Sequence, residues 1–457
     1  FINRMIQEED IRNVKIHRIK RNQEFKISGI TVRTFMMSHS IAESFGIAVE
    51  TPMGYIVYTS EFIIDFDAKD GFFGCDLTDL ADIGKKGVLC LLAESGGAER
   101  QGYTAPYHKI TSKILPVLEE AAGRVIITAY TQNLYRIIGI IEAANRLNKR
   151  IYFFEDELKE MIRVVERLGI YRVPMGLELP KSTYRDDMDD IIVLMTGNGR
   201  HVFRTMNKIA MQEDSRLQLR NTDTVIIASP IVPGTEIDAG ILENELYKMD
   251  LNIVTLNPKE VLSMHASSED LKMMLYLFKP QYYIPVKGEY RQLIANADIA
   301  TTMGLRPDRI VILDNGQIAE FEDGRLKSCS EQIEVSEVLI DGNENLDSAG
   351  YVLKDREMLS TDGVIVIGIV CNYQTKEIIA GPDVQSRGVF YLKDADYIVK
   401  TIADIIMDVI NTNVANGTYD NKLAREEARE KISRYVLKET GKRPMILPGI
   451  IEIMVSA

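Results

Sequence analysis

The sequence predicts an α/β protein: the order of its apolar segments predicts the fold class, and its length and composition predict several globular domains. Between about residues 111 and 229, short apolar runs of strand length alternate with amphipathic helical segments. This alternation is typical of a mostly parallel sheet that carries helices on both faces. The chain has 457 residues, of which 46% are hydrophobic and 26% charged, so about three globular domains are expected.

The first part of the chain is rich in predicted strands. In residues 25–35 and 46–51, apolar residues either alternate with polar ones or follow one another without a break. A Pro-Met-Gly turn signal precedes another strand at residues 55–59. This order of strand, turn and strand predicts one face of a mixed sheet. Residues 87–93 form a further buried strand, which ends in the loop at residues 94–99.

Alternating helices and strands follow from residue 111. The last two predicted strands end in loops that contain Gly or Pro, at residues 196–199 and 229–234. Ligands of parallel sheets bind beyond the carboxyl ends of the strands, so both loops are placed where a ligand would bind. The predicted elements are a helix with the apolar face Ile114, Leu115, Leu118 and Ala121, strands at residues 124–129, 150–154, 190–195 and 223–229, and a helix at about 134–148.

The end of the chain is expected to be a small α/β domain that follows a linker. Residues 323–332 are polar and predict the linker. Strands are expected around residues 363–370 and 376–380, and an amphipathic helix contains residues 402–410. A second helix is expected at about 422–439, where a run of charges indicates a solvated face.

Charge and composition restrict the function and the compartment. Lys and Arg total 54 against 67 Asp and Glu, a formal net charge of −13, so nucleic acid would need a local basic groove. The longest apolar run, residues 363–371, is shorter than a membrane span, and no signal peptide is found. We expect a cytoplasmic protein whose N-terminus is trimmed or unrecorded, because position 1 is not Met. Four scattered cysteines without metal spacing suit a reducing compartment: Cys75, Cys90, Cys329 and Cys371.

No short sequence motif identifies a function for this chain. The sequence contains no GxGxxG, GxxxxGK[ST] or GxSxG pattern, so dinucleotide, P-loop and nucleophile-elbow sites lose their main support. Its five histidines form no HxH or HExxH pair. On spacing alone, each is more readily a surface or hydrogen-bonded residue than a metal ligand.

Several segments, in order along the chain, together resemble the ribonuclease J family of metallo-β-lactamase/β-CASP nucleases. Their order makes the likeness more specific than any one motif. The segments are residues 37–47 (third metal motif), 58–62 (fourth), 87–95 (β-CASP motif A), 284–291 (the block of motif C), and 380–391 with 442–448 (C-terminal domain).

The resemblance implies a metallo-β-lactamase αββα sandwich, split by an inserted β-CASP parallel α/β domain and followed by a small C-terminal α/β domain. The sandwich is expected to be N-terminally incomplete. The apolar helix face at residues 402–410 would serve oligomerisation or fill its own core. The expected ranges are 1–107 for the first part of the lobe, 108–265 for β-CASP, 266–322 for the return of the lobe, 323–343 for the linker and 344–457 for a C-terminal oligomerisation domain.

In this family, two zinc ions held by His and Asp activate water for phosphodiester attack. The HxHxDH motif is missing because this chain begins downstream of its expected place. His39 matches the His of motif 3, but Glu61 replaces the bridging Asp of motif 4 and Glu94 replaces the Asp of motif A. Motif B, normally His-x-Ser-Gly-His, keeps only its first His, His265, and Lys287 replaces the His of motif C.

These replacements predict that the tight dinuclear zinc site is lost and that zinc is weakly bound or absent. Glu is longer than Asp by about 1 Å, whereas metal–ligand distances hold within about 0.2 Å. An ammonium has no lone pair for a metal ion. Because buried carboxylates need partners, Lys287 is predicted to pair with Glu94 or Glu61; the alternative is that it turns to solvent.

The resemblance also implies RNA contacts at the motif B loop and at the carboxyl edge of the inserted sheet. For residues 229–234 the alternative is a plain turn. Arg291 either contacts phosphate or pairs in the neighbourhood of Glu289. The substrate-binding candidates are His265, Ala266, Ser267, Ser229, Gly234 and Arg291.

The pattern of losses resembles the degenerate second ribonuclease J paralogue of Gram-positive bacteria. That resemblance implies a homodimer, or a hetero-oligomer with an active paralogue, that acts on RNA with 5′-monophosphate ends in mRNA decay and rRNA maturation. Weak or no nuclease activity is expected, with Glu94 and Lys287 in catalytic positions and His39 and Glu61 in metal positions. The alternatives are a fully active metal-dependent 5′-to-3′ exonuclease with altered ligands, and a scaffold that binds no RNA.

Overall fold

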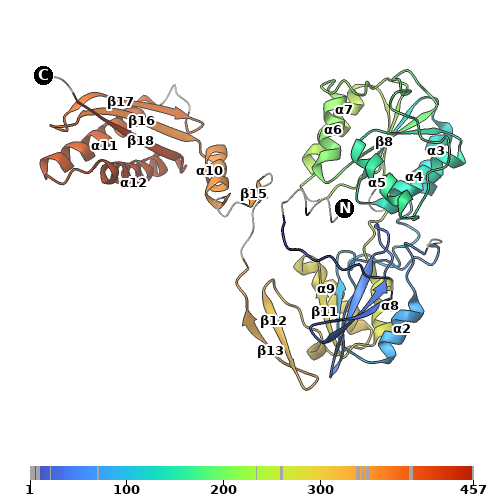
Figure 1. The fold of residues 1–457 in the computed structure, drawn as a ribbon. Coiled ribbons are helices and arrows are strands. Elements are labelled where there is room, and N and C mark those ends of the chain that lie inside the picture. Colours follow the sequence, from blue (N-terminus) through green and yellow to red (C-terminus); the bar gives the residue numbers. More distant parts are fainter. Residues whose placement is uncertain are drawn as a thin grey trace. The chain divides into compact units, whose positions relative to one another are not determined.

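The computed structural model describes residues 6, 11–20, 22–68, 71–232, 234–257, 261–335, 340–341, 344–345, 349–390 and 395–454. The chain forms two compact units (Figure 1). The larger unit is Lys15–Glu334, and the smaller consists of Phe1–Val14 and Val335–Ala457.

A six-stranded mixed sheet, here named the lobe sheet, takes five strands from the first part of the larger unit and one strand from its last part. Its order is β1-β2-β3-β4-β5-β11; the first four strands are antiparallel, and β4, β5 and β11 are parallel. The predicted mixed sheet is therefore confirmed. The strands are β1 Glu24–Ile27, β2 Ile30–Met36, β3 Phe45–Thr51, β4 Gly54–Tyr58, β5 Val88–Glu94 and β11 Tyr282–Val286, and the accompanying helices are α2 Leu77–Lys85, α8 Ser268–Phe278 and α9 Tyr290–Thr302, with the 3₁₀ turn η1 Pro307–Arg309.

The start of this sheet corrects one prediction. Residues 25–35, predicted as one strand-like run, fold back as the hairpin β1–β2. The turn falls at Ser28 and Gly29, whose φ angles of 50° and 85° are both positive. Two-residue hairpin turns of this kind match the right-handed twist of the strands.

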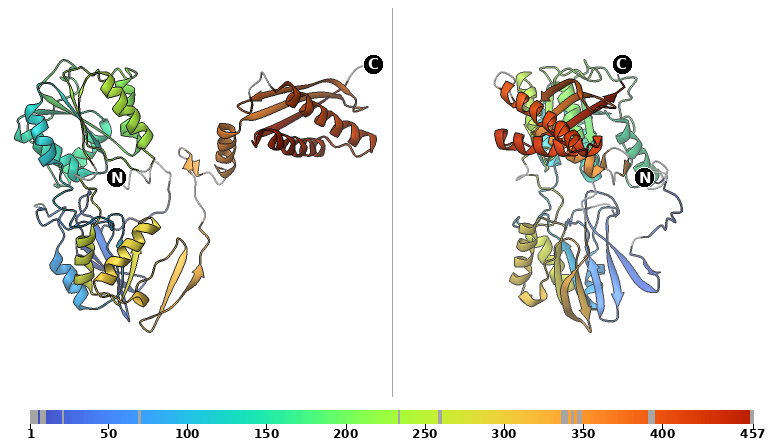
Figure 2. Two further views of the ribbon diagram at one scale, coloured as in Figure 1. Left: turned by 180° about the vertical axis from the view of Figure 1, so that it is seen from behind. Right: turned by 90° about the vertical axis from the view of Figure 1, so that its left-hand side faces the viewer.

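A five-stranded parallel sheet, here named the parallel sheet, forms the middle of the larger unit. Its order is β10-β9-β6-β8-β7, and all its pairs are parallel. Helices α3, α4 and α5 pack on one face, and α6 and α7 pack on the other (Figure 2). This confirms the prediction of a parallel sheet covered on both faces. The elements are α3 Thr111–Glu120, β6 Val125–Tyr130, α4 Leu134–Arg146, β7 Arg150–Phe153, α5 Asp156–Arg167, β8 Ile191–Gly197, α6 Arg200–Ala210, β9 Thr224–Ile227, α7 Glu236–Lys248 and β10 Asn252–Thr255.

Hydrogen bonds link the carboxyl ends of three parallel strands, β6, β8 and β9. The two loops that contain Gly or Pro were expected to lie at this edge of the sheet. The Tyr130 hydroxyl donates to the Pro230 carbonyl oxygen at 2.6 Å. The backbone N–H of Thr131 donates to the Gly197 carbonyl at 3.3 Å. The loops that follow β6, β8 and β9 therefore share one edge of the sheet.

A buried ion-pair cluster joins the lobe to the parallel sheet. The carboxylate of Asp65, only 3% exposed, lies 3.2 Å from His108 Nε2 and 3.2 Å from Lys109 Nζ. The Tyr135 hydroxyl donates to the same carboxylate at 3.1 Å. Burial, the largest influence, raises the pKa of Asp65, but the contact with His108, the hydrogen bond from the backbone N–H of Asp67 and the charge of Lys109 outweigh it and hold the pKa well below its usual value of 3.8.

Asp65→Asn is expected to destabilise the protein by about 3 kcal/mol at neutral pH, because it leaves the Lys109 ammonium without its counter-charge and the buried His108 without its carboxylate partner. A carboxyl group with a depressed pKa stabilises the fold above its unfolded pKa, and this contribution is lost as the pH falls below that value. The difference between the two proteins should therefore shrink below about pH 3.8. Urea unfolding between pH 3 and 7 measures it. Asp67→Asn, at a 77% exposed position, is the control; equal effects of both substitutions would contradict the assignment.

The structure also corrects the expected linker. Residues 323–332 are the turn and second strand of a hairpin formed by β12 Gln317–Glu322 and β13 Arg325–Gln332. Asp323 and Gly324 occupy the turn with φ of 47° and 74°. Leu326 and Cys329 pack against a cluster that includes residues of β5 and β11. A few apolar contacts thus fix this polar, exposed hairpin to the lobe sheet.

The smaller unit contains a three-stranded sheet of order β17-β16-β18, with α11 and α12 packed on one face (Figure 1). The apolar face at residues 402–410 fills this core: Ile402, Ile406, Val409 and Ile410 are fully buried. The oligomerisation role considered for this face is therefore wrong, and its alternative is confirmed. The elements are β14 Ile340–Asp341, β15 Glu344–Asn345, α10 Ala349–Thr361, β16 Val364–Asn372, β17 Ile378–Arg387, α11 Asp396–Ala415, α12 Asn421–Thr440 and β18 Met445–Ile453.

The opposite face of this sheet is open within the described part of the unit. Val366, Leu447 and Ile451 are 46%, 44% and 58% exposed. Across the whole described chain, no helix combines the length and the apolar composition needed to cross a membrane.

Candidate functional site

Five of the predicted site residues meet at one edge of the lobe sheet. Glu61 follows β4, Glu94 ends β5, and Lys287 follows β11. Because β4, β5 and β11 are parallel neighbours, their carboxyl ends lie together. His39, from the loop after β2, and His265, from the segment before α8, complete the cluster, and their ring centroids are 5.9 Å apart.

Lys287 pairs with Glu61, which confirms the prediction that it takes a carboxylate partner. Its Nζ lies 2.9 Å from Glu61 Oε1, while His39 Nε2 lies 3.3 Å from Glu61 Oε2. The contact with His39, followed by that with Lys287, lowers the pKa of Glu61 to about 2 against the opposing effect of burial. The hydrogen bond to Glu61 in turn raises the pKa of Lys287. Both oxygens of this carboxylate are therefore engaged.

Glu94 is saturated by different partners. Its side chain is 1% exposed. Oε1 accepts backbone N–H donors from Phe62 at 2.7 Å and Ala266 at 3.1 Å, and Oε2 lies 2.7 Å from His265 Nδ1. Burial, the largest influence, lowers the pKa of His265, but the hydrogen bond and charge of Glu94, with the charge of Glu61, raise it overall. The Glu94–His265 pair was not foreseen, because the sequence alone does not place the motif B loop against β5.

Backbone conformation at the site is unusual. The φ angles are 54° for Lys287 and 62° for Ser60, the residue before Glu61. Residues other than Gly rarely adopt this backbone conformation. At Gly97, a Cβ atom would lie 2.4 Å from the Ala266 carbonyl oxygen. The loop after β5 therefore needs Gly there in order to pack against the segment before α8.

A buried carboxylate that the sequence analysis missed holds the loops of the site together. Asp270, fully buried, accepts backbone N–H donors from Ser267 at 2.9 Å, Thr104 at 2.9 Å and Ile64 at 3.1 Å. Ser267 and Asp270 form a capping box at the start of α8. The Ser-x-x-Asp spacing was a signal for this cap.

Other polar groups brace the same loops. Arg100 Nη2 donates to the His265 carbonyl at 2.6 Å. The side-chain amide of Asn296 donates to the Glu94 carbonyl at 2.9 Å and to the Ser95 hydroxyl at 3.0 Å. Neither Arg100 nor Asn296 was predicted, since their contacts join segments far apart in the chain.

The other predicted substrate-binding residues make different contacts in the structure. Ala266 and Ser267 are fully buried, and the Ser267 hydroxyl is bonded to Thr104 Oγ1 at 2.8 Å, so this geometry does not support a phosphate contact. Arg291 binds Glu289 at 2.8 Å and Glu99 at 2.8 Å, the ion-pair alternative.

Ser229 and Gly234 lie at the carboxyl edge of the parallel sheet. The Ser229 side chain is 3% exposed, and its hydroxyl has no hydrogen-bond partner among the described residues. Gly234 is exposed and has φ of 89°. No hydrogen bond or ion pair found in the described part of the chain links either residue to the five-residue cluster.

The described residues do not fit a zinc ion. Within the described ranges, no group of three or more His, Cys, Asp or Glu side chains is arranged to hold a metal. Both carboxylates already accept from protein donors, and the Lys287 ammonium stands at the edge where another ligand would be needed. A cation in this position repels a metal ion and offers it no lone pair.

Three protein-family models match the chain. The model of the ribonuclease J β-CASP domain matches residues 122–246, that of the Zn-dependent metallo-hydrolase RNA specificity domain matches residues 254–309, and that of the ribonuclease J C-terminal domain matches residues 351–453.

Similar curated proteins carry the name ribonuclease J 2. The protein of Staphylococcus saprophyticus is 28% identical over 443 residues, and those of Staphylococcus epidermidis and Staphylococcus aureus are 27% identical. Each alignment covers 97% of this chain and 79% of the relative. A solved protein of unknown function from Enterococcus faecalis aligns over 62% of this chain and 67% of its own, at 15% identity and a TM-score of 0.43, a value too low to establish a common fold.

Proposed function

Because the chain belongs to the ribonuclease J family of RNA-processing nucleases, with the metallo-β-lactamase/β-CASP fold, we propose that it is a family subunit with weak or no nuclease activity of its own. The observation that carries this proposal is the ion pair of 2.9 Å between Lys287 and Glu61. It places an ammonium where the resemblance implies a metal ligand. Zinc, the cofactor of the family, would then be weakly bound or absent.

The domain division expected from the sequence stays a proposal, with two changes. Two sheets within Lys15–Glu334 support a lobe with its return at residues 266–322 around a β-CASP insertion of residues 108–265, but the first part of the lobe, expected at 1–107, begins at residue 15, because Phe1–Val14 belong to the smaller unit. The hairpin β12–β13 moves the start of the linker beyond residue 332. The C-terminal domain would begin near residue 344.

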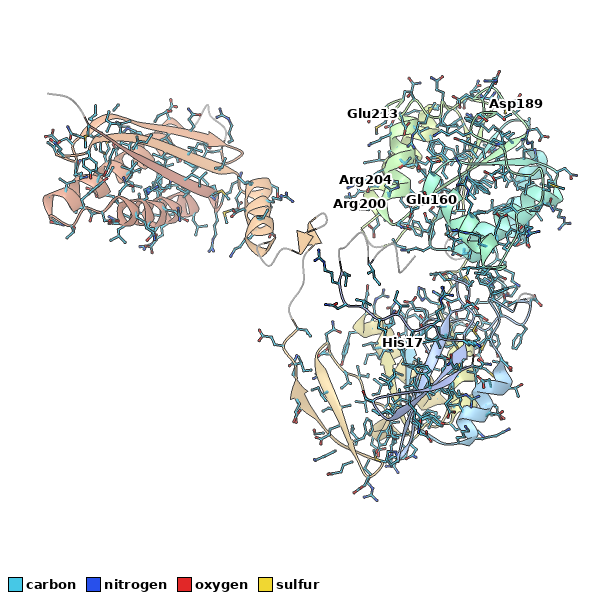
Figure 3. The ribbon with its side chains drawn as sticks, viewed as in Figure 1. His17, Glu160, Asp189, Arg200, Arg204 and Glu213 are labelled. Atoms are coloured by element: carbon cyan, nitrogen blue, oxygen red, sulfur yellow. The ribbon has the colours of Figure 1, made fainter. Side chains whose placement is uncertain are left out.

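The proposed role includes holding RNA, with 5′-monophosphate ends as its target. The carboxyl edge of the parallel sheet supports this, because Ser229 and Gly234 lie there and α6 begins beside it. Arg200 and Arg204, labelled in Figure 3, are 52% and 57% exposed in the first turns of α6, and their Nε atoms lie 2.7 Å and 3.6 Å from the Asp238 carboxylate, so a phosphate would bind their remaining N–H donors. Exposed guanidinium groups bind phosphates by charge and by paired hydrogen bonds.

The proposed assembly, in the cytoplasm, is a homodimer or a hetero-oligomer with an active ribonuclease J paralogue. The apolar face of α11 is unavailable because it fills the core of its own unit. The open face of the β16–β18 sheet, with exposed Val366, Leu447 and Ile451, supports an interface there instead.

The direct test is degradation of a 5′-monophosphorylated RNA by the full-length protein, with its zinc content measured on the same preparation. We expect degradation at background rate and less than one zinc ion per chain. His39→Ala and Lys287→Ala should leave that rate unchanged, as should the control Lys248→Ala at an exposed position of α7. Activity that rises with bound zinc and disappears in His39→Ala would identify the alternative, a metal-dependent 5′-to-3′ exonuclease.

RNA affinity separates the two inactive roles. A subunit that grips RNA should bind it with an affinity that falls steeply as the salt concentration rises, because counterions are released from the phosphates. A protein that raises the rate of its active paralogue without measurable RNA affinity would be a scaffold.

A further inference from the structure

A cavity lies at the junction of the lobe and the parallel sheet, and neither Glu61 nor Lys287 lines it. Its volume is about 300 Å³, within the range of small-molecule sites. Its walls come from the loop at residues 67–68, the segment at 108–111 and helix α4. The polar side chains that line it include Asp67, His108, Lys109, Thr111, Tyr135 and Arg136.

Arg136 is the exceptional group in this wall. The residue is 6% exposed, and the one hydrogen bond that its guanidinium makes to the described residues runs from Nη1 to the Ala228 carbonyl at 2.8 Å. Its Nε is buried without a partner, and no ion pair to a carboxylate is found for it among the described residues. Burial alone lowers its pKa to about 10. An unpaired charge in the interior is costly, and native proteins normally give it a counter-charge.

The carboxylates near the cavity are already engaged. Asp65 binds Lys109, lies beside His108 and accepts from Tyr135, while Lys109 also lies 3.5 Å from Asp67. Glu142, which lines the cavity as well, also has an interaction partner. The positive charge of Arg136 is thus left without compensation in the described part of this wall. Both ring nitrogens of His108 are also buried without a hydrogen-bond partner among the residues that the structure describes, although Nε2 lies 3.2 Å from the Asp65 carboxylate.

We propose that this cavity binds a small oxyanion, a free phosphate or the phosphate or carboxylate group of a small molecule, with Arg136 as its counter-charge. Because Nη1 is bonded to the Ala228 carbonyl and Nε is enclosed, Nη2 is the guanidinium nitrogen that would donate to such a group, and the charge adds to this hydrogen bond. The apolar part of the wall, with Phe73, Ile110 and Ile138, can cover the uncharged part of a ligand.

A ligand in this cavity would act on the contact between the lobe and the parallel sheet. Tyr135, the neighbour of Arg136, donates its backbone N–H to the Ser40 carbonyl at 3.0 Å and its hydroxyl to Asp65. Ser40 directly follows His39 in the chain. Occupancy should therefore hold α4 against the lobe and raise thermal stability.

The test is the thermal unfolding midpoint of the full-length protein in three ligand arms: inorganic phosphate, a nucleoside 5′-monophosphate and citrate. Sodium chloride at equal ionic strength is the reference. We expect a rise of about 3 °C at near-saturating ligand in at least one arm. The arm that responds identifies the source of the oxyanion, and no response in any arm would overturn the proposal.

Arg136→Met removes the charge and keeps much of the apolar stem. Without ligand, its midpoint should equal or exceed that of the parent, since an unpaired buried charge is gone. With ligand, the rise should disappear, whereas Arg146→Met, at an exposed position of the same helix, should keep it. A ligand-induced rise that survives Arg136→Met would overturn the assignment.

Isothermal titration of the parent protein gives a second readout, independent of whether Arg136→Met folds. It should find one site per chain for the ligand that raised the midpoint. No measurable heat of binding from any of the three ligands would overturn the proposal.

Discussion

The double substitution of Lys287→His with Glu61→Asp is expected to create zinc binding that the parent protein lacks, with a Kd of about 1 µM or lower. It replaces the ammonium by an imidazole and shortens the neighbouring carboxylate by about 1 Å, the length that separates Glu from Asp. His39 already lies 3.3 Å from the Glu61 carboxylate. Two imidazoles and one carboxylate are a ligand set that holds zinc in other proteins.

Competition against a chromophoric zinc indicator measures this gain on the full-length chain. The control is Lys287→Gln with Glu61→Asp, which also removes the ammonium but supplies no imidazole, so it should gain much less affinity. A parent protein that binds zinc as tightly as the double variant would contradict the conclusion that Lys287 blocks the site.

Asp270→Ala is expected to lower the free energy of unfolding by about 4 kcal/mol. Three backbone N–H groups in the interior, those of Ile64, Thr104 and Ser267, lose their acceptor together. Each buried donor left unsatisfied costs about 1–3 kcal/mol. The loops that carry Glu61 and His265 should then separate, so the loss reaches the site itself.

Denaturant unfolding measures this loss. Glu269→Ala is the matched control, because the neighbouring side chain forms only a surface ion pair with Lys272, and its loss should cost less than about 1 kcal/mol. A cost for Asp270→Ala as small as that of the control would show that the three N–H groups find other acceptors.

Much of the fold could be predicted from sequence because the signals were local. The alternation of apolar strands and amphipathic helices predicted the parallel sheet, and the turn signals predicted the mixed sheet. The hairpin at residues 317–332 was missed because an exposed polar ribbon has the composition of a linker, although its Asp-Gly pair is a known turn signal. The hydrogen bond from Ile64 to Asp270 spans 206 positions, and no local pattern carries such information.

The candidate site, like the fold, could be predicted only in part from the sequence. Charge balance predicted that Lys287 would take a carboxylate partner, and it does so although the pair is partly exposed, with the Glu61 side chain 32% and the Lys287 side chain 47% accessible. Which carboxylate it takes depends on geometry: Glu94 is enclosed by Phe62, Ala266 and His265, which leaves Glu61 for the ammonium. The interior role of Ser267 was missed because its hydroxyl bonds within the fold, to Thr104.

The Glu61–Lys287 pair also constrains how this chain can change by inheritance. Glu61→Asp alone draws the carboxylate away from the ammonium and still leaves a cation where a metal would sit. Lys287→His alone removes the counter-charge of Glu61 while keeping a carboxylate of the wrong length. Each single change therefore removes the ion pair before a metal ligand set is complete, so the pair itself opposes a return to metal binding by one substitution at a time.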